Sequence, residues 1–124
     1  MPSPQRDKGS RFELAVQDHV QAHGFPWAEK TRAGYERDYG DLHLEPITRA
    51  VIAQCKNHNR ITLPEWLVQL RRQVEASGAE HGFLVVKRRG VQDPGKSFAV
   101  MELDELLRLL RAAGYGDPPE EAAS

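Results

Sequence analysis

The sequence predicts an α/β domain in which a five-stranded sheet is flanked by helices, with the elements in the order αβββαββα. Two patterns carry this prediction. Apolar side chains recur at helical spacing in residues 8–23, 62–77 and 104–113, whereas short apolar or alternating segments lie between them. The 124 residues are 40% apolar and 28% charged, which is typical of one globular domain and leaves no room for a second core.

The first two helices have recognisable ends. The first is expected over residues 8–23 and stops at Gly24, because glycine commonly ends a helix. Its buried stripe would consist of Phe12, Ala15, Val16, His19 and Val20. The second begins at a capping box, in which the Thr62 hydroxyl accepts from a helical amide and Glu65 reaches back, and it ends at Gly78. Its apolar stripe would consist of Trp66, Leu67, Leu70 and Val74.

The five strands are shorter than the helices. They are expected over residues 25–33, 38–44, 51–57, 82–87 and 97–101. A tight turn joins the second strand to the third, and the fourth strand is apolar enough to be central in the sheet. A basic hairpin that contains glycine joins the fourth strand to the fifth.

The last helix closes the domain. Asp104 is expected to cap it and Gly114 to end it. Its inward-facing side chains would be Leu106, Leu107, Leu109 and Leu110. We therefore expect a single domain over residues 8–114, with a flexible lead-in over residues 1–7 and an acidic, disordered tail over residues 115–124.

Polar side chains gather where the second and third strands meet. Alternation places Gln54 and Lys56 on one face of the third strand and turns Cys55 to the other, where it suits a small buried side chain. The leucines of the second strand suit the core, which turns Asp41 and His43 away from it. We expect Asp41 to converge with Gln54 and Lys56 at the ends of these neighbouring strands.

This arrangement resembles the core of the PD-(D/E)XK nucleases, in which an acidic residue precedes an apolar strand that ends in (D/E/Q)-x-K. The corresponding residues here are Asp41 and the run Gln54-Cys55-Lys56. Within that superfamily the chain is most similar to the small Holliday junction resolvases, whose opening helix carries Lys-Gly-x-x-x-Glu, present here as Lys8-Gly-Ser-Arg-Phe-Glu13. The similarity covers roughly Lys8 to Glu102. Gln54 stands where the second acid is usual, a variant known among restriction-type members.

The resemblance implies a nuclease domain with a restriction-endonuclease-like core, a central mixed five-stranded sheet, and a Mg²⁺ site in which Mn²⁺ can substitute. Asp41 would be the principal metal ligand, completed by Glu13, the side-chain oxygen of Gln54 and the backbone carbonyl of Cys55. Lys56 would orient the attacking water and stabilise the phosphoryl charge, giving 5′-phosphate and 3′-hydroxyl products. Without the resemblance, Glu13 would be interpreted as a solvated helix charge.

Residues that could contact DNA surround this motif. The candidates are Lys8, Ser10, Arg11, Lys30, Arg32, Asn57, Arg60, Lys87, Arg88 and Arg89. Cationic side chains neutralise phosphates, although each of these residues could equally be an ordinary exposed one. The net charge of −1 does not decide the matter, because without the tail from Asp117 onward the chain has 17 Lys or Arg against 15 Asp or Glu.

The leading interpretation is a Mg²⁺-dependent, structure-selective endonuclease that resolves Holliday junctions in DNA recombination and repair. A homodimer would match the paired scissile strands of a four-way junction. Residues 82–86 and the following hairpin could form the dimer contact or simply belong to the core. A cytoplasmic location is expected, since the sequence shows neither a secretory signal nor a membrane-spanning run.

Two other interpretations stay open. A restriction- or repair-type nuclease for duplex DNA would keep the chemistry and change the substrate. A DNA-binding module that lost turnover through Gln54 would keep only the fold. Within either nuclease, His43 is a weaker candidate than Lys56 for activating the water.

Overall fold

The computed structural model describes residues 4–30, 41–48 and 50–117, with the side chains of residues 4–7, 30 and 41 outside that description. A helix, three strands, a helix, two strands and a helix follow one another along the chain, with one turn of 3₁₀ helix between the last two strands. This order is the predicted αβββαββα. The fold class is therefore confirmed.

The five strands form one mixed sheet in the order β1-β2-β3-β4-β5. They are β1 (Glu29–Lys30), β2 (Asp41–His43), β3 (Val51–Lys56), β4 (His81–Val86) and β5 (Phe98–Val100). β3 and β4 run parallel, whereas the other neighbouring pairs are antiparallel. β4 has a strand on each side, so it is central as predicted and offers no free edge for a dimer contact.

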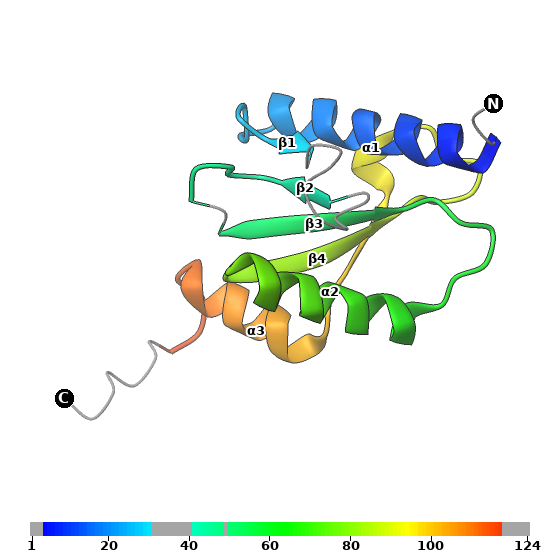
Figure 1. Ribbon diagram of the computed structural model, residues 1–124. Coiled ribbons are helices and arrows are strands. Elements are labelled where there is room, and N and C mark those ends of the chain that lie inside the picture. The colour runs from blue at the N-terminus through cyan, green and yellow to red at the C-terminus, as the bar shows by residue number, and fades with distance from the viewer. Residues whose placement is uncertain (1–3, 31–40, 49, 118–124) are drawn as a thin grey trace.

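Helix α1 (Pro4–Ala22) covers one face of the sheet (Figure 1). The core on this side consists of Phe12, Val16, Ala28, Leu42, Leu44, Ala53 and Val85. Cys55 is half-buried and packs against this core, as predicted for a small apolar side chain. The 3₁₀ turn Pro94–Lys96 also contacts α1, so the basic hairpin folds onto this helix.

Helix α2 (Leu63–Ser77) covers the opposite face (Figure 1). The core there consists of Trp66, Leu70, Leu84 and Val86. Gly82 lets α2 approach β4 closely, because a Cβ at this position would lie 2.5 Å from Cγ2 of Val74. The helix ends as predicted at Gly78, which adopts a left-handed conformation with φ of 73°.

Three predictions at helix starts are wrong. α1 begins at Pro4 and takes in part of the expected lead-in, because proline is tolerated in a first turn that needs no amide donor. Thr62 precedes α2, but its backbone (φ −126°, ψ 68°) is not extended and its side chain makes no capping hydrogen bond. Glu102, not Asp104, occupies the N-cap position of α3 (Leu103–Ala112), and its side chain makes no capping hydrogen bond. Asp104 lies in the first turn, where a carboxylate interacts favourably with the helix dipole.

The third helix departs most from its prediction. No residue of α3 is buried, although four of its leucines were expected to pack inward. Leu106, Leu107 and Leu110 are 37%, 48% and 38% exposed. Of the four leucines, Leu109 alone is half-buried. Helical spacing identifies an apolar face, but it does not identify what covers that face.

The first strand begins later than predicted, at Glu29. Residues 25–28 form a turn instead, in which the amide of Ala28 donates to the carbonyl of Phe25 at 3.0 Å, while Pro26 has no amide to offer a neighbouring strand. The predicted end of the first strand, the start of the second and the end of the acidic tail lie outside the described residues, which omit residues 31–40 and 118–124. No helix in the described part of the chain is both long and apolar enough to cross a bilayer.

Candidate active site

The register of β2 and β3 brings two predicted site positions together. Asp41 lies directly opposite Gln54 in this antiparallel pair, and His43 lies opposite Ile52. Directly opposite residues share a face of the sheet, with Cβ atoms about 4.5–5.5 Å apart. The predicted convergence of Asp41 with Gln54 is confirmed for the backbone, whereas the Asp41 carboxylate is outside the described side chains.

Gln54 is a buried polar residue on the α2 side of the sheet. It is 7% exposed, and its Oε1 atom has no hydrogen-bond partner among the described residues. Leaving a buried acceptor unsatisfied costs about 1–3 kcal/mol, so such an atom in a folded protein calls for an explanation such as a bound ion or water. The side-chain oxygen of Gln54, opposite Asp41, is the kind of ligand that Mg²⁺ and Ca²⁺ bind.

Lys56 follows Gln54 on the same face of β3, and α2 holds its ammonium group. Nζ of Lys56 lies 3.3 Å from Oε1 of Gln69 and 5.6 Å from the centre of the Trp66 ring. The amide oxygen accepts a hydrogen bond, and the face of the indole ring attracts the cation. Because Trp66 and Gln69 are three residues apart on α2, they lie on the same side of the helix and act together.

His58, in the loop after β3, lies in a positively charged environment. Its ring centre is 5.4 Å from that of Trp66. Partial burial lowers the pKa of His58 below its ordinary value, and the charges of Lys56 and Lys8 lower that pKa further. The carboxyl end of β3 therefore presents a concentration of positive charge, which favours an anionic ligand such as a phosphodiester.

The start of α1 is tied to the same loop. Nδ2 of Asn57 donates to the main-chain oxygen of Lys8 at 3.4 Å, and Nζ of Lys8 donates to Oδ1 of Asn59 at 3.2 Å. These two hydrogen bonds place the ammonium of Lys8 beside the residues that follow Lys56. The predicted Lys-Gly-x-x-x-Glu helix and the predicted Gln-x-Lys strand therefore meet at one end of the sheet.

Four of the candidate DNA-contacting residues line one pocket of about 340 Å³ between α1 and the basic hairpin. They are Lys8, Arg11, Asn57 and Lys87. No acidic side chain contributes to the described lining of this pocket. Its three cations are therefore not neutralised by carboxylates in the pocket itself.

The other DNA candidates are more scattered. Arg60, Arg88 and Arg89 are exposed, and Ser10 is half-buried on α1. The guanidinium of Arg88 lies 5.1 Å from the centre of the Phe98 ring, so this side chain is partly occupied within the hairpin. The Lys30 side chain and all of Arg32 lie outside the described residues.

Glu13 is carried by the helix on the other side of the sheet. It is half-buried next to Phe12, which packs against the face opposite Lys56. The side chains that the structure describes contain no group of three His, Cys, Asp or Glu residues able to hold a metal ion. The unsatisfied oxygen of Gln54 still fits an oxygen-preferring cation. Glu13 and the carbonyl of Cys55 stay predicted ligands.

A family model for restriction endonucleases, Mrr_cat, matches residues 5–113. The chain belongs to this restriction endonuclease family. The resemblance to PD-(D/E)XK nucleases is thereby confirmed, and DNA phosphodiester hydrolysis is the activity of the family. Nucleases with this fold generally use divalent metal ions. No curated protein and no solved structure matches the chain.

Sequence reasoning missed the residues that support the site in this restriction endonuclease domain. Trp66 was assigned only to the core, and neither Gln69 nor His58 was counted among the site residues. The spacing of Trp66 and Gln69 on one helical face was visible, but only the packing of α2 on β3 shows that this face meets Lys56.

Proposed function

We propose that this restriction endonuclease family member is a Mg²⁺-dependent endodeoxyribonuclease that leaves 5′-phosphate and 3′-hydroxyl ends. The observation that carries the proposal is the placement of Asp41 opposite Gln54, whose buried Oε1 has no partner among the described residues, with Lys56 next on the same face. Asp41 and Gln54 would hold the ion, with Glu13 and the Cys55 carbonyl as further ligands.

The protein side chains and the ion would divide the chemistry. A bound Mg²⁺ supplies Lewis-acid stabilisation of the charge that develops on the phosphoryl group. Lys56 can donate a hydrogen bond to the attacking water and neutralise charge on a phosphate oxygen. Gln69 and Trp66 hold the ammonium before the substrate arrives, which avoids the cost of ordering it during the reaction.

The cationic pocket supports DNA as the bound polymer. Lys8, Arg11 and Lys87 line it, and Asn57 links it to the loop that follows Lys56. Lysine and arginine side chains in such a position neutralise phosphates next to the scissile one without reading base sequence. Loss of one of these cations would weaken DNA binding without removing the reacting groups.

Two DNA substrates suit this chemistry. The family match favours duplex DNA, the substrate of a restriction-type enzyme. A four-way junction is the second candidate, because the Lys8–Glu13 pattern resembles the opening helix of junction resolvases and α1 contacts the loop after β3. Both candidates require the same site and differ in how DNA strands are presented to it.

The substrate is tested by incubating the protein and Mg²⁺ with an end-labelled duplex, an immobile four-way junction and a single strand. Cutting of the duplex supports the restriction-type reading. Paired, symmetric nicks confined to the junction support the resolvase and exclude general duplex cleavage. DNA binding without cutting in either Mg²⁺ or Mn²⁺ contradicts the nuclease proposal and leaves a DNA-binding module.

The site is tested with two substitutions in the same cleavage reaction. Asp41→Asn and Lys56→Ala should each lower the cleavage rate by about 100-fold or more, as expected for groups that stabilise developing charge. Lys96→Ala is the matched control, because Lys96 is an exposed lysine outside the site. Circular dichroism and DNA binding show whether each variant is folded. Undiminished cleavage by both site variants would remove the assignment.

A further inference from the structure

Helix α3 carries four leucines that the rest of the described chain leaves exposed. Leu103, Leu106, Leu107 and Leu110 recur at spacings of three and four residues, and their exposed fractions are 68%, 37%, 48% and 38%. Residues at these spacings form one stripe along a helix. A contiguous apolar stripe on a soluble protein usually marks a contact surface.

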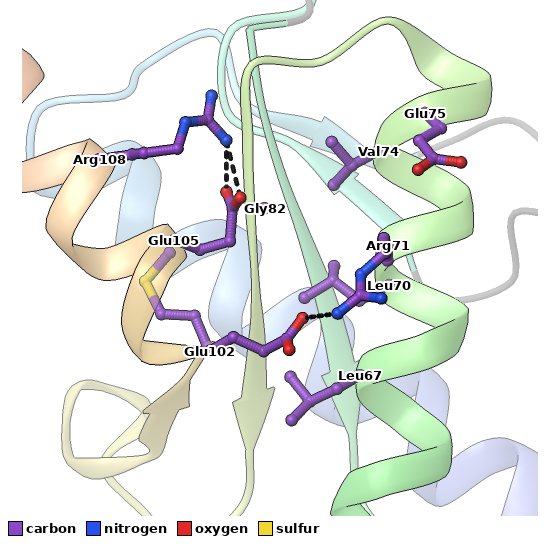
Figure 2. Close-up of a pocket in the computed structure, with 10 residues that line it drawn as sticks. Leu67, Leu70, Arg71, Val74, Glu75, Gly82, Glu102, Glu105 and Arg108 are labelled. Carbon is purple, nitrogen blue, oxygen red and sulfur yellow. Dashed lines mark hydrogen bonds and ion pairs between the residues drawn. The ribbon is translucent and has the colours of Figure 1, made fainter.

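The groove beside α3 does not receive this leucine stripe. It has a volume of about 250 Å³ and lies between α2 and α3, with an apolar floor that includes Leu67, Leu70 and Val74 (Figure 2). The α3 residues that line it are Glu105 and Arg108, and none of the four stripe leucines does so. The stripe therefore faces another direction and lacks a cover within the described chain.

Most charges around α3 are already satisfied. Figure 2 shows Glu102 joined to Arg71 of α2, and Arg108 joined to Glu105 one turn earlier. Arg108 also donates to the main-chain oxygen of Glu80 at 3.1 Å. These contacts fix α3 against the domain through the sides of the helix that do not carry the leucines.

Two charged residues remain at the edge of the leucine stripe. Asp104 follows Leu103 and Arg111 follows Leu110, so both lie along the same edge, seven residues or about two helical turns apart. Neither makes an ion pair with another described residue. Among the described residues, the stripe thus has a negative charge without an ion pair at its beginning and a positive charge without one at its end.

We propose that α3 is the contact surface of a homodimer, in which the leucine stripes of two copies pack antiparallel about a two-fold axis. In that arrangement Leu103 of one copy meets Leu110 of the other, and the central Leu106 and Leu107 meet each other. Asp104 of each copy then lies beside Arg111 of the other copy, which forms two equivalent ion pairs. The contact is isologous, because the same patch serves on both copies.

The charge pattern selects a second copy in this orientation. In an antiparallel two-fold pair the same edge of both helices lies on one side of the contact, so Asp104 of each copy meets Arg111 of the other at both ends. In a parallel two-fold pair these edges lie on opposite sides of the contact, so neither ion pair forms. A helical surface of this length is smaller than a standard protein interface, so we expect a reversible dimer rather than an obligate one. The inference does not depend on the nuclease site and is tested without DNA.

The first test is sedimentation velocity of the full chain at concentrations up to about 100 µM, a range suited to a small interface. The wild type should shift from monomer to dimer. Leu107→Lys should raise the dissociation constant by about 100-fold or more, since each leucine is buried twice in a two-fold contact. Leu14→Lys, a leucine 51% exposed on α1, is the matched control and should dimerise normally. A wild-type chain that stays monomeric throughout, or a Leu107→Lys chain that still dimerises normally, would overturn the proposal.

The second test reverses the charges of Asp104 and Arg111, so it tests the antiparallel contact without the leucine variant. Asp104→Arg and Arg111→Asp should each weaken the dimer, because each places like charges together at both ends of the contact. The double variant Asp104→Arg with Arg111→Asp should restore dimerisation, because it recreates opposite charges in the reverse order. A double variant no better than the single ones would contradict the antiparallel contact.

Discussion

The ammonium of Lys56 lies 3.3 Å from the side-chain oxygen of Gln69. Helix α2, which covers one face of the sheet, therefore holds the lysine of the Gln-x-Lys motif. This contact joins α2 to the carboxyl end of β3. Together with the Trp66 ring at 5.6 Å, it makes the position of Lys56 a property of the packed domain rather than of the strand alone.

Gln69→Leu should lower kcat by about three- to tenfold and leave DNA affinity nearly unchanged. The reason is that Lys56 loses an acceptor whose hydrogen bond is worth about 1 kcal/mol. Gln73→Leu, one turn further along α2, is the matched control. Single-turnover cleavage and a binding titration separate the two effects. If Gln69→Leu changed affinity alone, Gln69 would be a DNA contact instead.

Substitutions of Gln54 should change the requirement for Mg²⁺ in opposite directions. Gln54→Glu adds a carboxylate, so about tenfold less Mg²⁺ should give half-maximal cleavage, and Mg²⁺ should raise the melting temperature more than in the wild type. Gln54→Leu removes the buried oxygen, so more Mg²⁺ should be needed. Equal Mg²⁺ titrations for all three proteins would exclude Gln54 as a ligand.

His58 should make the folded protein less stable in acid. Because its pKa is lowered in the folded state from 6.5, the unfolded state binds more protons between the folded pKa and 6.5. The contribution of His58 to the free energy of unfolding is therefore present above pH 6.5 and is lost as pH falls through the folded pKa. Urea unfolding from about pH 5 to about pH 8 should show a shallower pH dependence for His58→Gln. A steeper dependence for that variant would mean that the sign is wrong.

Gly82→Ala should destabilise the domain by about 1–3 kcal/mol, because a methyl group there overpacks the contact between α2 and β4. The added Cβ would lie 2.5 Å from Val74 and 3.1 Å from Leu70. Gly9→Ala on α1 is the control, since no atom lies within 4 Å of its added Cβ. Denaturant unfolding measures both variants. A neutral effect at Gly82 would show that α2 can move away from the strand at little cost.

Much of the fold could be predicted because the core strands carry strong local patterns. The apolar run of β4 and the alternation of β3 place both strands correctly, and Gly78 marks the end of α2. The helix starts were less predictable. A threonine before a helix can cap it, but the backbone of Thr62 turns away from the capping conformation.

The site was predictable where it depends on strand register and not where it depends on helix packing. Alternation along the chain was enough to place Asp41 near Gln54, because one face of each strand had to be buried. The support of Lys56 by Trp66 and Gln69 depends on how α2 crosses the sheet. The exposed leucines of α3 were misassigned for the same reason, since the periodicity is identical for a face covered by the chain itself and one left open.

The most direct measurement is Mg²⁺-dependent cleavage of labelled DNA by the wild type and by Lys56→Ala, with EDTA as the metal-free control. We expect the wild type to cut in Mg²⁺ and leave 5′-phosphate ends, the variant to bind DNA with little cutting, and EDTA to stop the reaction. DNA cleavage that continues in EDTA, or that is equally fast without the Lys56 ammonium, would contradict a metal-dependent nuclease site at the end of β3.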